Sequence, residues 1–205
     1  MTAITALRSQ FDDASTPRIS PANQSFMTDV SAQISFRPAQ RHDAAALSAL
    51  SRQTFYETFV EGFGIPYPAD DLEAYFQDSF APEALISRIQ AKDCLFLVAE
   101  RQGELLALCH AGPNGLPHPQ AKAGEMELRR LYVSKAAQGL GLGTHLMQAA
   151  LEWMQANTSG ALWIGVWSGN DKAQKLYHAY GFEKVGEYDY PVGDWLDREF
   201  ILRRP

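Results

Sequence analysis

The stretch that most constrains this chain is residues 125–147, which read as a strand, a glycine-rich turn and a helix. The strand-like part ends in the apolar run 131–133, and Gly139, Gly141 and Gly143 follow it. The first N–H groups of a helix have no partner within the helix, and the helix dipole is positive there. Because glycines also let the backbone approach a ligand closely, this stretch predicts a site for an anion, in particular a pyrophosphate.

Three phosphate-binding motifs, and a turn that binds nothing, compete for these glycines. A Walker A loop requires a lysine after its last glycine, but Thr144 follows Gly143 directly. A Rossmann turn reads G-x-G-x-x-G and needs an acidic residue after the next strand, and no acid closes the apolar run 163–167. An empty turn is disfavoured because each glycine adds an entropic cost to folding. The remaining pattern, Q-x-x-G-x-G over residues 138–143, matches the sequence.

Composition restricts the class of protein. The 205 residues suit one domain, and a hydrophobic content of 46% allows a substantial core. The net charge of −6, without a cluster of Lys or Arg, argues against a nucleic-acid partner. An acidic surface favours a cationic substrate instead.

Residues 1–32 are rich in Ser, Thr, Ala and Asp and show no sustained period, so we expect a flexible N-terminal extension before a domain at 33–205. No apolar run approaches the ~18 residues of a membrane span, and no signal-peptide pattern is present. Cys94 and Cys109 lie in apolar, strand-like runs, which favours a reducing, cytoplasmic location. Neither cysteines nor histidines have metal-ligand spacing, so no metal is expected.

Hydrophobic periodicity predicts a mixed α/β (α+β) domain with about seven strands. The expected strands are 34–37, 94–100, 104–111, 125–133, 161–167, 182–190 and 197–202. Helical spacing begins near residues 42, 70, 82, 142 and 170. Helices after the fourth and fifth strands favour a right-handed crossover and one parallel pair at these strands, with the other pairs antiparallel.

Two motifs in this order resemble those of a known family. The Q-x-x-G-x-G turn is similar to the acetyl-CoA loop of the GNAT superfamily of N-acetyltransferases, and N-x-x-A-x-x-L-Y-x-x-Y-G-F over 170–182 is similar to its closing segment. The likeness covers roughly residues 34–203 and implies a mostly antiparallel sheet, splayed at the parallel pair, with helices on both faces. The phrases at 55–59, 127–133 and 165–167 most resemble PaiA-like polyamine acetyltransferases.

The resemblance implies acetyl-CoA as co-substrate. The backbone edge of residues 131–133 would pair with the pantetheine arm and supply an oxyanion donor, and the loop N–H groups would bind the pyrophosphate. The implied cofactor-binding residues are Leu131, Tyr132, Val133, Gln138, Gly139, Leu140, Gly141, Leu142, Gly143, Thr144 and Asn170. Asn170 also suits a helix N-cap.

Acetyl transfer to an amine needs a base, since an alkylammonium with a pKa near 10.4 is almost wholly protonated at neutral pH. The resemblance points to Glu127 as this base, with Glu125 and His110 as weaker candidates, and to Tyr177 as the acid that protonates the leaving thiolate. No Cys or Ser has an activated setting, so direct attack by the amine is expected.

The acceptor pocket is expected between the first helices, loop 113–124 and the final hairpin. Glu57, Phe59 and Glu61 are the predicted substrate-binding residues, in a segment that resembles a lid over the substrate. Further acids in those places are Asp70, Asp71, Asp189 and Asp194, and together they could bind a polyamine or form a solvated surface. A small polyamine is the favoured acceptor. A protein N-terminus or lysine, a non-catalytic acyl-CoA sensor and assembly into a homodimer remain open.

Overall fold

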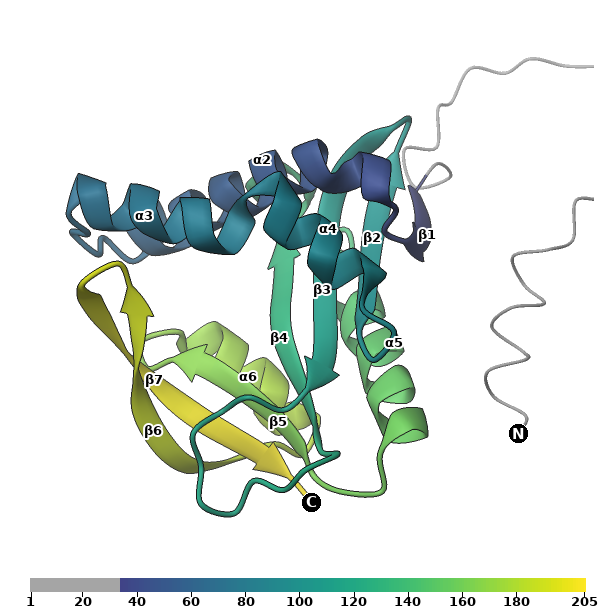
Figure 1. The fold of residues 1–205 in the computed structure, drawn as a ribbon, viewed down its shortest axis with the longest axis vertical. Coiled ribbons are helices and arrows are strands. Elements are labelled where there is room, and N and C mark those ends of the chain that lie inside the picture. Colours follow the sequence, from purple (N-terminus) through teal and green to yellow (C-terminus); the bar gives the residue numbers. More distant parts are fainter. Residues whose placement is uncertain (1–33) are drawn as a thin grey trace, which may run out of the picture. The chain divides into compact units, whose positions relative to one another are not determined.

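The computed structural model describes residues 34–205, so the expected N-terminal extension at 1–32 lies outside the described residues. One seven-stranded sheet forms the centre, in the order β1-β2-β3-β4-β5-β7-β6 (Figure 1). Its strands are β1 Ile34–Pro38, β2 Leu95–Arg101, β3 Glu104–Pro113, β4 Met126–Val133, β5 Leu162–Trp167, β6 Glu183–Val192 and β7 Trp195–Arg204. The prediction of a mixed α/β fold around a sheet of this size is confirmed.

The parallel pair is β4–β5, and every other pair of neighbouring strands is antiparallel. Pairing between β4 and β5 covers only Met126–Leu128 against Leu162–Ile164, after which the two strands separate. The crossover from β4 to β5 runs through α5, Leu142–Asn157. The predicted splayed parallel pair is therefore present, and the gap opens on the loop that carries the glycines.

Helices cover both faces of the sheet (Figure 1). On one face, α2 (Ala44–Phe55) and α4 (Pro82–Gln90) pack on apolar side chains of β2 and β3, and α3 (Ala69–Phe80) packs on the end of α2, on β4 and on β6. On the other, α5 and α6 (Asp171–Ala179) enclose the largest hydrophobic cluster. None of the helices among residues 34–205 is long and apolar enough to cross a membrane.

Two local features differ from the periodicity of the sequence. The first helix ends at Phe55 and continues as the π-helical segment η2, Tyr56–Gly62, which alters the direction of the side chains that follow. The last hairpin was expected to turn over residues 191–194, but its strands extend to Val192 and resume at Trp195. Val192 is fully buried in the α3 cluster, which explains why it belongs to the strand.

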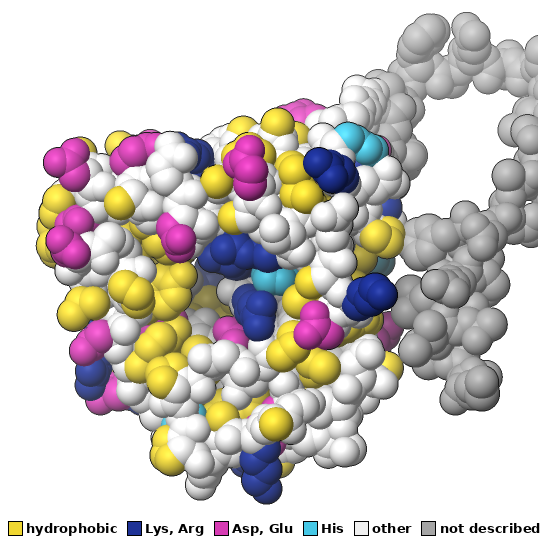
Figure 2. All heavy atoms as spheres, in the orientation of Figure 1, with side chains coloured by type: hydrophobic (Ala, Val, Ile, Leu, Met, Phe, Trp, Pro, Cys, Tyr) yellow, Lys and Arg dark blue, Asp and Glu magenta, His cyan; other side chains and the backbone are white. Residues whose placement is uncertain are grey.

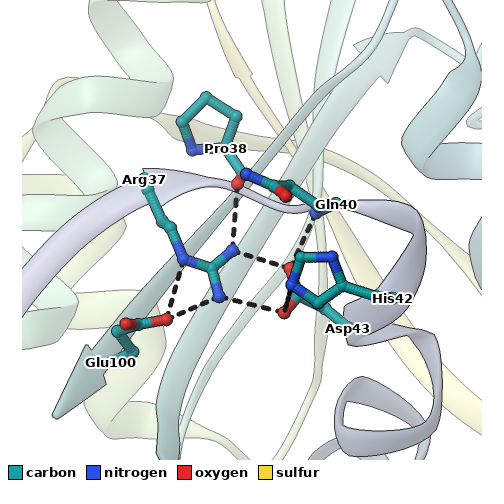
Figure 3. Close-up of polar contacts among 6 residues, drawn as sticks. All are labelled: Arg37, Pro38, Gln40, His42, Asp43 and Glu100. Atoms are coloured by element: carbon teal, nitrogen blue, oxygen red, sulfur yellow. Dashed lines mark hydrogen bonds and ion pairs between the residues drawn. The ribbon is translucent and has the colours of Figure 1, made fainter. Parts of the chain in front are cut away.

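An ion cluster connects the start of the domain to the sheet (Figure 3). Arg37 on β1 donates to both carboxylate oxygens of Asp43, at 2.7 and 2.9 Å, and to Glu100 on β2 at 2.7 Å. These hydrogen bonds hold the pKa of the Asp43 carboxyl below its ordinary value. The short 3-10 segment η1, Arg41–Asp43, is thereby anchored, and it leads directly into α2.

Candidate active site

The glycine loop forms a cradle of unused backbone donors. Gly139 and Gly141 have φ of +85° and +78°, a region that residues with a Cβ rarely adopt. Gly141 is the N-cap of α5, and its carbonyl accepts the N–H of His145 at 3.1 Å. Within the described chain, the N–H groups of residues 139–144 have no hydrogen-bond partner. Six successive free donors at a helix N-terminus are suited to an anion with several oxygens.

The side chains of the loop divide by exposure. Gln138, Gly139, Leu140, Gly141 and Thr144 are exposed, Gly143 is half-buried, and Leu142 packs in the main core. The main chain of the loop is therefore open to a ligand, while Leu142 anchors the loop to the protein.

The strand β4 presents an open edge beside this loop. On one side, residues 131–133 pair with β3, where Leu131 faces Cys109 and Val133 faces Ala107. On the other side, pairing with β5 stops at Leu128. The edge from Arg129 to Val133 therefore has no neighbouring strand, and a chain of amides can pair with it as an added strand does.

A β-bulge in β4 determines which side chains share a face. Leu128 pairs with Ala111 and Arg130 with His110, so Arg129 is the extra residue on β4. Glu127 pairs with Gly112, which lies two residues from His110 on β3. Glu127, Arg130 and Tyr132 consequently point to the face that carries α2, α3 and α4.

Two carboxylates approach each other on this face from different strands. Glu127 is half-buried, and its Oε2 accepts the N–H of Gly115 at 2.8 Å. Burial raises the pKa of Glu127. Glu199 on β7 is also half-buried, and burial together with the charges of Asp197 and Glu127 raises its pKa to about 7. A carboxyl with this pKa can accept and release protons at neutral pH.

Glu199 is positioned by its sheet neighbours. It is the cross-strand partner of Trp167 on β5 and of Tyr188 on β6, and the Tyr188 hydroxyl donates to its Oε2 at 2.6 Å. A Cβ on Gly165 would lie 2.9 Å from both the Glu199 carboxylate and the Tyr188 hydroxyl. A glycine at position 165 is therefore what makes room for this pair.

Tyr177 lies on α6 and interacts electrostatically with Glu199. It is 9% exposed on α6, and burial followed by the charge of Glu199 raises its pKa to about 12. Its hydroxyl has no hydrogen-bond partner among the described residues, so its proton is free to be donated. Asn170 caps α6, with its side chain accepting the N–H of Ala173 at 3.0 Å, which confirms the predicted N-cap.

Glu125, one of the weaker base candidates, has a structural role. It is 4% exposed, and its carboxylate accepts hydrogen bonds from Lys122 N at 2.9 Å, Ala161 N at 3.2 Å and Trp163 Nε1 at 2.7 Å. These three bonds connect loop 113–124 to β5. The other weaker candidate, His110, is 1% exposed, and its pKa falls to about 3 because of burial and the neighbouring arginines.

The side chains of the three predicted substrate-binding residues contact different parts of the structure. Phe59 packs against Trp167 at the end of β5, with ring centroids 6.4 Å apart. Glu57 accepts the N–H of Lys135 at 3.0 Å, and Glu61 lies 3.8 Å from the Lys135 ammonium. The two carboxylates border a surface depression of about 510 Å³ that Arg52 also lines.

The other four acids considered for a polyamine lie on the periphery. Asp70 and Asp194 are exposed, and the half-buried Asp71 accepts the N–H of Asp194 at 2.9 Å. Asp189 on β6 pairs with Arg198 at 3.2 Å.

A hollow opens on the helix-covered face, over β3 and β4 and between α3–α4 and the β6–β7 hairpin (Figure 2). Lys or Arg and His side chains are visible at its walls, with acidic side chains below them. The sequence predicted the acceptor pocket between the first helices, loop 113–124 and the last hairpin, and the assignment of this hollow to the acceptor stays a prediction. No group of three or more His, Cys, Asp or Glu side chains in residues 34–205 is arranged to hold a metal ion.

Comparison with known proteins agrees with this geometry. The model of the "Acetyltransferase (GNAT) family" matches residues 52–182. A curated relative from Lactobacillus delbrueckii subsp. lactis, an "Uncharacterized N-acetyltransferase in pepI 3'region", is 25% identical over 162 residues, which cover 79% of this chain and 91% of the relative. The matched family defines an acyltransferase. This chain belongs to the acetyltransferase (GNAT) family.

Solved structures show the same fold. The PaiA N-acetyltransferase from Thermoplasma acidophilum, in complex with coenzyme A, superposes with a TM-score of 0.64 at 21% identity, covering 83% of this chain and 98% of that one. The ribosomal-protein-S18-alanine N-acetyltransferase from Escherichia coli gives a TM-score of 0.59 at 17% identity, covering 84% and 93%. Because such different enzymes share the fold, the fold does not select the acceptor.

Sequence reasoning missed two residues of this site, Glu199 and Arg130. The signal for Glu199 is Gly165, an isolated glycine in an otherwise apolar strand, which marks a close approach by another group. No signal in the sequence revealed the bulge at Arg129 that turns Arg130 toward the hollow.

Proposed function

We propose that the protein transfers the acetyl group of acetyl-CoA to a primary amine by direct attack. The observation that carries this proposal is the row of six free N–H groups at 139–144 beside the unpaired edge of β4. The loop suits the pyrophosphate, and the β4 edge from Arg129 to Val133 suits the amide-rich pantetheine arm. A thioester at the end of that arm would lie where β4 and β5 separate.

The carboxylates on the open face would prepare the amine. An ammonium group enters protonated, and Glu199, with a pKa of about 7, is suited to accept its proton directly or through water. Glu127, the predicted base, contributes its charge to the same site and remains the second candidate. The free amine then attacks the thioester carbonyl carbon, and a backbone N–H of the open β4 edge would stabilise the oxyanion.

Collapse of the tetrahedral intermediate breaks the C–S bond, and the attacking nitrogen passes its one excess proton to water to become the amide. The departing thiolate needs a proton, and the Tyr177 hydroxyl is protonated at neutral pH and has no hydrogen-bond partner within residues 34–205. Tyr177 is therefore proposed as the acid, and it recovers its proton from solvent after the product leaves.

A small polyamine was the acceptor favoured by the sequence, and it stays a prediction. Glu57 and Glu61, two of the carboxylates proposed to receive it, already interact with Lys135, which reduces their capacity to bind a second cation. A protein N-terminus or lysine side chain is the alternative acceptor, and an acyl-CoA sensor without turnover is the alternative of a different class. A cytoplasmic location and a homodimer also stay predictions.

The release of free CoA from acetyl-CoA in the presence of a broad amine panel tests the proposal. An enzyme releases CoA only when an amine is present and yields the N-acetylated amine in equal amount. If the protein binds acetyl-CoA and acetylates no amine of the panel, it is a sensor. If it binds no CoA ester, both functions are excluded.

A further inference from the structure

The walls of the hollow above β3 and β4 carry cations without carboxylate partners. By its register on β4, Arg130 points to the face of the sheet on which the hollow opens, Arg88 on α4 interacts electrostatically with Arg130, and Arg129 lies at the bulge. Among residues 34–205 no carboxylate oxygen lies within 4.0 Å of any of these three guanidinium groups. Arg88 donates to the backbone carbonyl of Ser79, and Arg129 to that of Pro113, so neutral acceptors hold two of them in place.

Arg130 is held by hydrogen bonds to the Tyr75 and Tyr132 hydroxyls and by an aromatic ring, and by no carboxylate of residues 34–205. Its Cζ lies 5.3 Å from the ring centroid of Phe80. Its polar surroundings are the hydroxyls of Tyr75, Tyr132 and Tyr190. Arginine stays charged at any physiological pH and presents five N–H donors in a planar fork. Its nearest environment here is aromatic, so the fork retains unused donors.

The three arginines all interact electrostatically with one buried polar side chain, His110. His110 is the cross-strand partner of Arg130, it is 1% exposed, and neither its Nδ1 nor its Nε2 has a hydrogen-bond partner in the part of the chain that the structure describes. Its ring stacks on Phe96 with centroids 5.1 Å apart, which fixes its plane. Arg130, Arg129 and Arg88 all disfavour the imidazolium, so the ring is neutral and offers one N–H.

Two carboxylates on the same face of the sheet have the reverse charge. Glu127 and Glu199 interact electrostatically with Arg130 but lie beyond ion-pair distance from it. Two like charges such as Arg88 and Arg130 repel each other, and the pKa of Arg88 is lowered by burial and by Arg130. A bound anion would offset the repulsion between these arginines, so this site favours a ligand with a negatively charged group.

We propose that the acceptor is an amine that also carries a carboxylate, and that Arg130 binds this carboxylate with Arg88 and His110 beside it. The amine of the same molecule then faces Glu199 and Glu127. This inference rests on the proposed acetyl transfer and names its substrate class, an amino acid or an amine of similar zwitterionic form. A polyamine would bring a second cation toward Arg130 and would be repelled.

Matched acceptor pairs test the substrate class. The panel contains the common amino acids, β-alanine and 4-aminobutanoate, each with its carboxamide, and spermidine as the polyamine. Free-CoA release gives kcat/KM for each compound. We expect at least one acid to exceed its own amide by roughly 10- to 100-fold, the range of a hydrogen bond to a charged group. Equal rates for every acid and amide, or the highest rate for spermidine, would overturn the proposal.

Arg130→Met removes the guanidinium and keeps the length of the side chain. It should abolish the preference of acid over amide, because kcat/KM for the acid should fall further than kcat/KM for its amide by the whole of the wild-type preference. Arg130→Lys should restore part of the preference, since it keeps the charge and loses the planar fork. Arg198→Met is the matched control, an exposed arginine paired with Glu187 and Asp189, and it should leave the preference intact.

Two results separate this inference from the proposed function. If neutral amines are acetylated and the acids are not, acetyl transfer stands and the carboxylate site is wrong. If no amine is acetylated, both are wrong. Affinity for acetyl-CoA, measured by calorimetry, should be the same in wild type, Arg130→Met and Arg198→Met. A preference that persists in a folded Arg130→Met variant would also refute the role of Arg130.

Discussion

Replacing Glu199 by glutamine is expected to make the protein more stable above neutral pH while it removes acetyl transfer. Burial, together with the charges of Asp197 and Glu127, disfavours the charge of Glu199, and its folded pKa is about 7 against an ordinary 4.5. As pH rises from about 4.5 to 7, the unfolded chain releases this proton first, so wild-type stability falls across that window. Glutamine carries no charge at any of these pH values and can still accept the Tyr188 hydroxyl.

The magnitude follows from the two pKa values. At 1.36 kcal/mol for each tenfold change in proton affinity, the raised pKa of Glu199 costs the folded state at most about 3 kcal/mol at pH 8. Glu199 is half-buried, so solvent screening reduces this to about 1–2 kcal/mol. For a domain of this size, Glu199→Gln should raise Tm by about 2–8 °C at pH 8 and by almost nothing at pH 5.

Thermal unfolding of both proteins at pH 5 and pH 8 measures this difference. Glu187→Gln is the control, because Glu187 is exposed and hydrogen bonds from Arg198 lower its pKa, so its removal brings no gain at pH 8. Free-CoA release should fall by roughly 100-fold or more in Glu199→Gln. The wild-type rise in kcat/KM through about pH 7 should disappear as well. Equal Tm values at pH 8, or activity with an unchanged pH profile, would refute the reasoning.

Three further variants address the acid, the loop and the scaffold. Tyr177→Phe should lower kcat by about 100-fold while the Kd for acetyl-CoA stays unchanged, because only the proton for the thiolate is lost; a weakened Kd instead would make Tyr177 a binding residue. Gly141→Ala, at a φ of +78°, should weaken acetyl-CoA binding and cost about 1 kcal/mol of stability, checked by calorimetry and urea unfolding. Glu125→Ala leaves three donors unpaired and should cost about 2–4 kcal/mol in urea unfolding, and a cost near zero would contradict its anchoring role.

The cofactor side of the site was largely predictable from the sequence. The anion cradle, its helix and the strand before it all lie within residues 125–147, so their chemistry depends on local spacing alone. The N-cap role of Asn170 is local for the same reason. The parallel β4–β5 pair could be predicted from the helix between the two strands, because a strand–helix–strand connection favours parallel strands.

The acceptor side depends on contacts that the sequence does not display. Glu199 acts through the register that sets it opposite Trp167 and next to Gly165, more than 30 positions earlier in the chain. Within β7 it stands in a run of three charged residues with Asp197 and Arg198, so alternation of polarity does not show which of them faces inward. Arg130 is turned toward the hollow by one extra residue, Arg129, and simple alternation along β4 would have placed Arg129 beside Glu127 instead.

The central claim is that this chain moves an acetyl group from acetyl-CoA to an amine in one direct step. Mass spectrometry of a single turnover tests it most directly, with enzyme in excess over acetyl-CoA and each amine of the panel present. The account predicts one N-acetylated amine for each CoA released and an enzyme of unchanged mass throughout. Acetyl-CoA that is bound and remains intact, or an acetylated enzyme formed without amine, would contradict it.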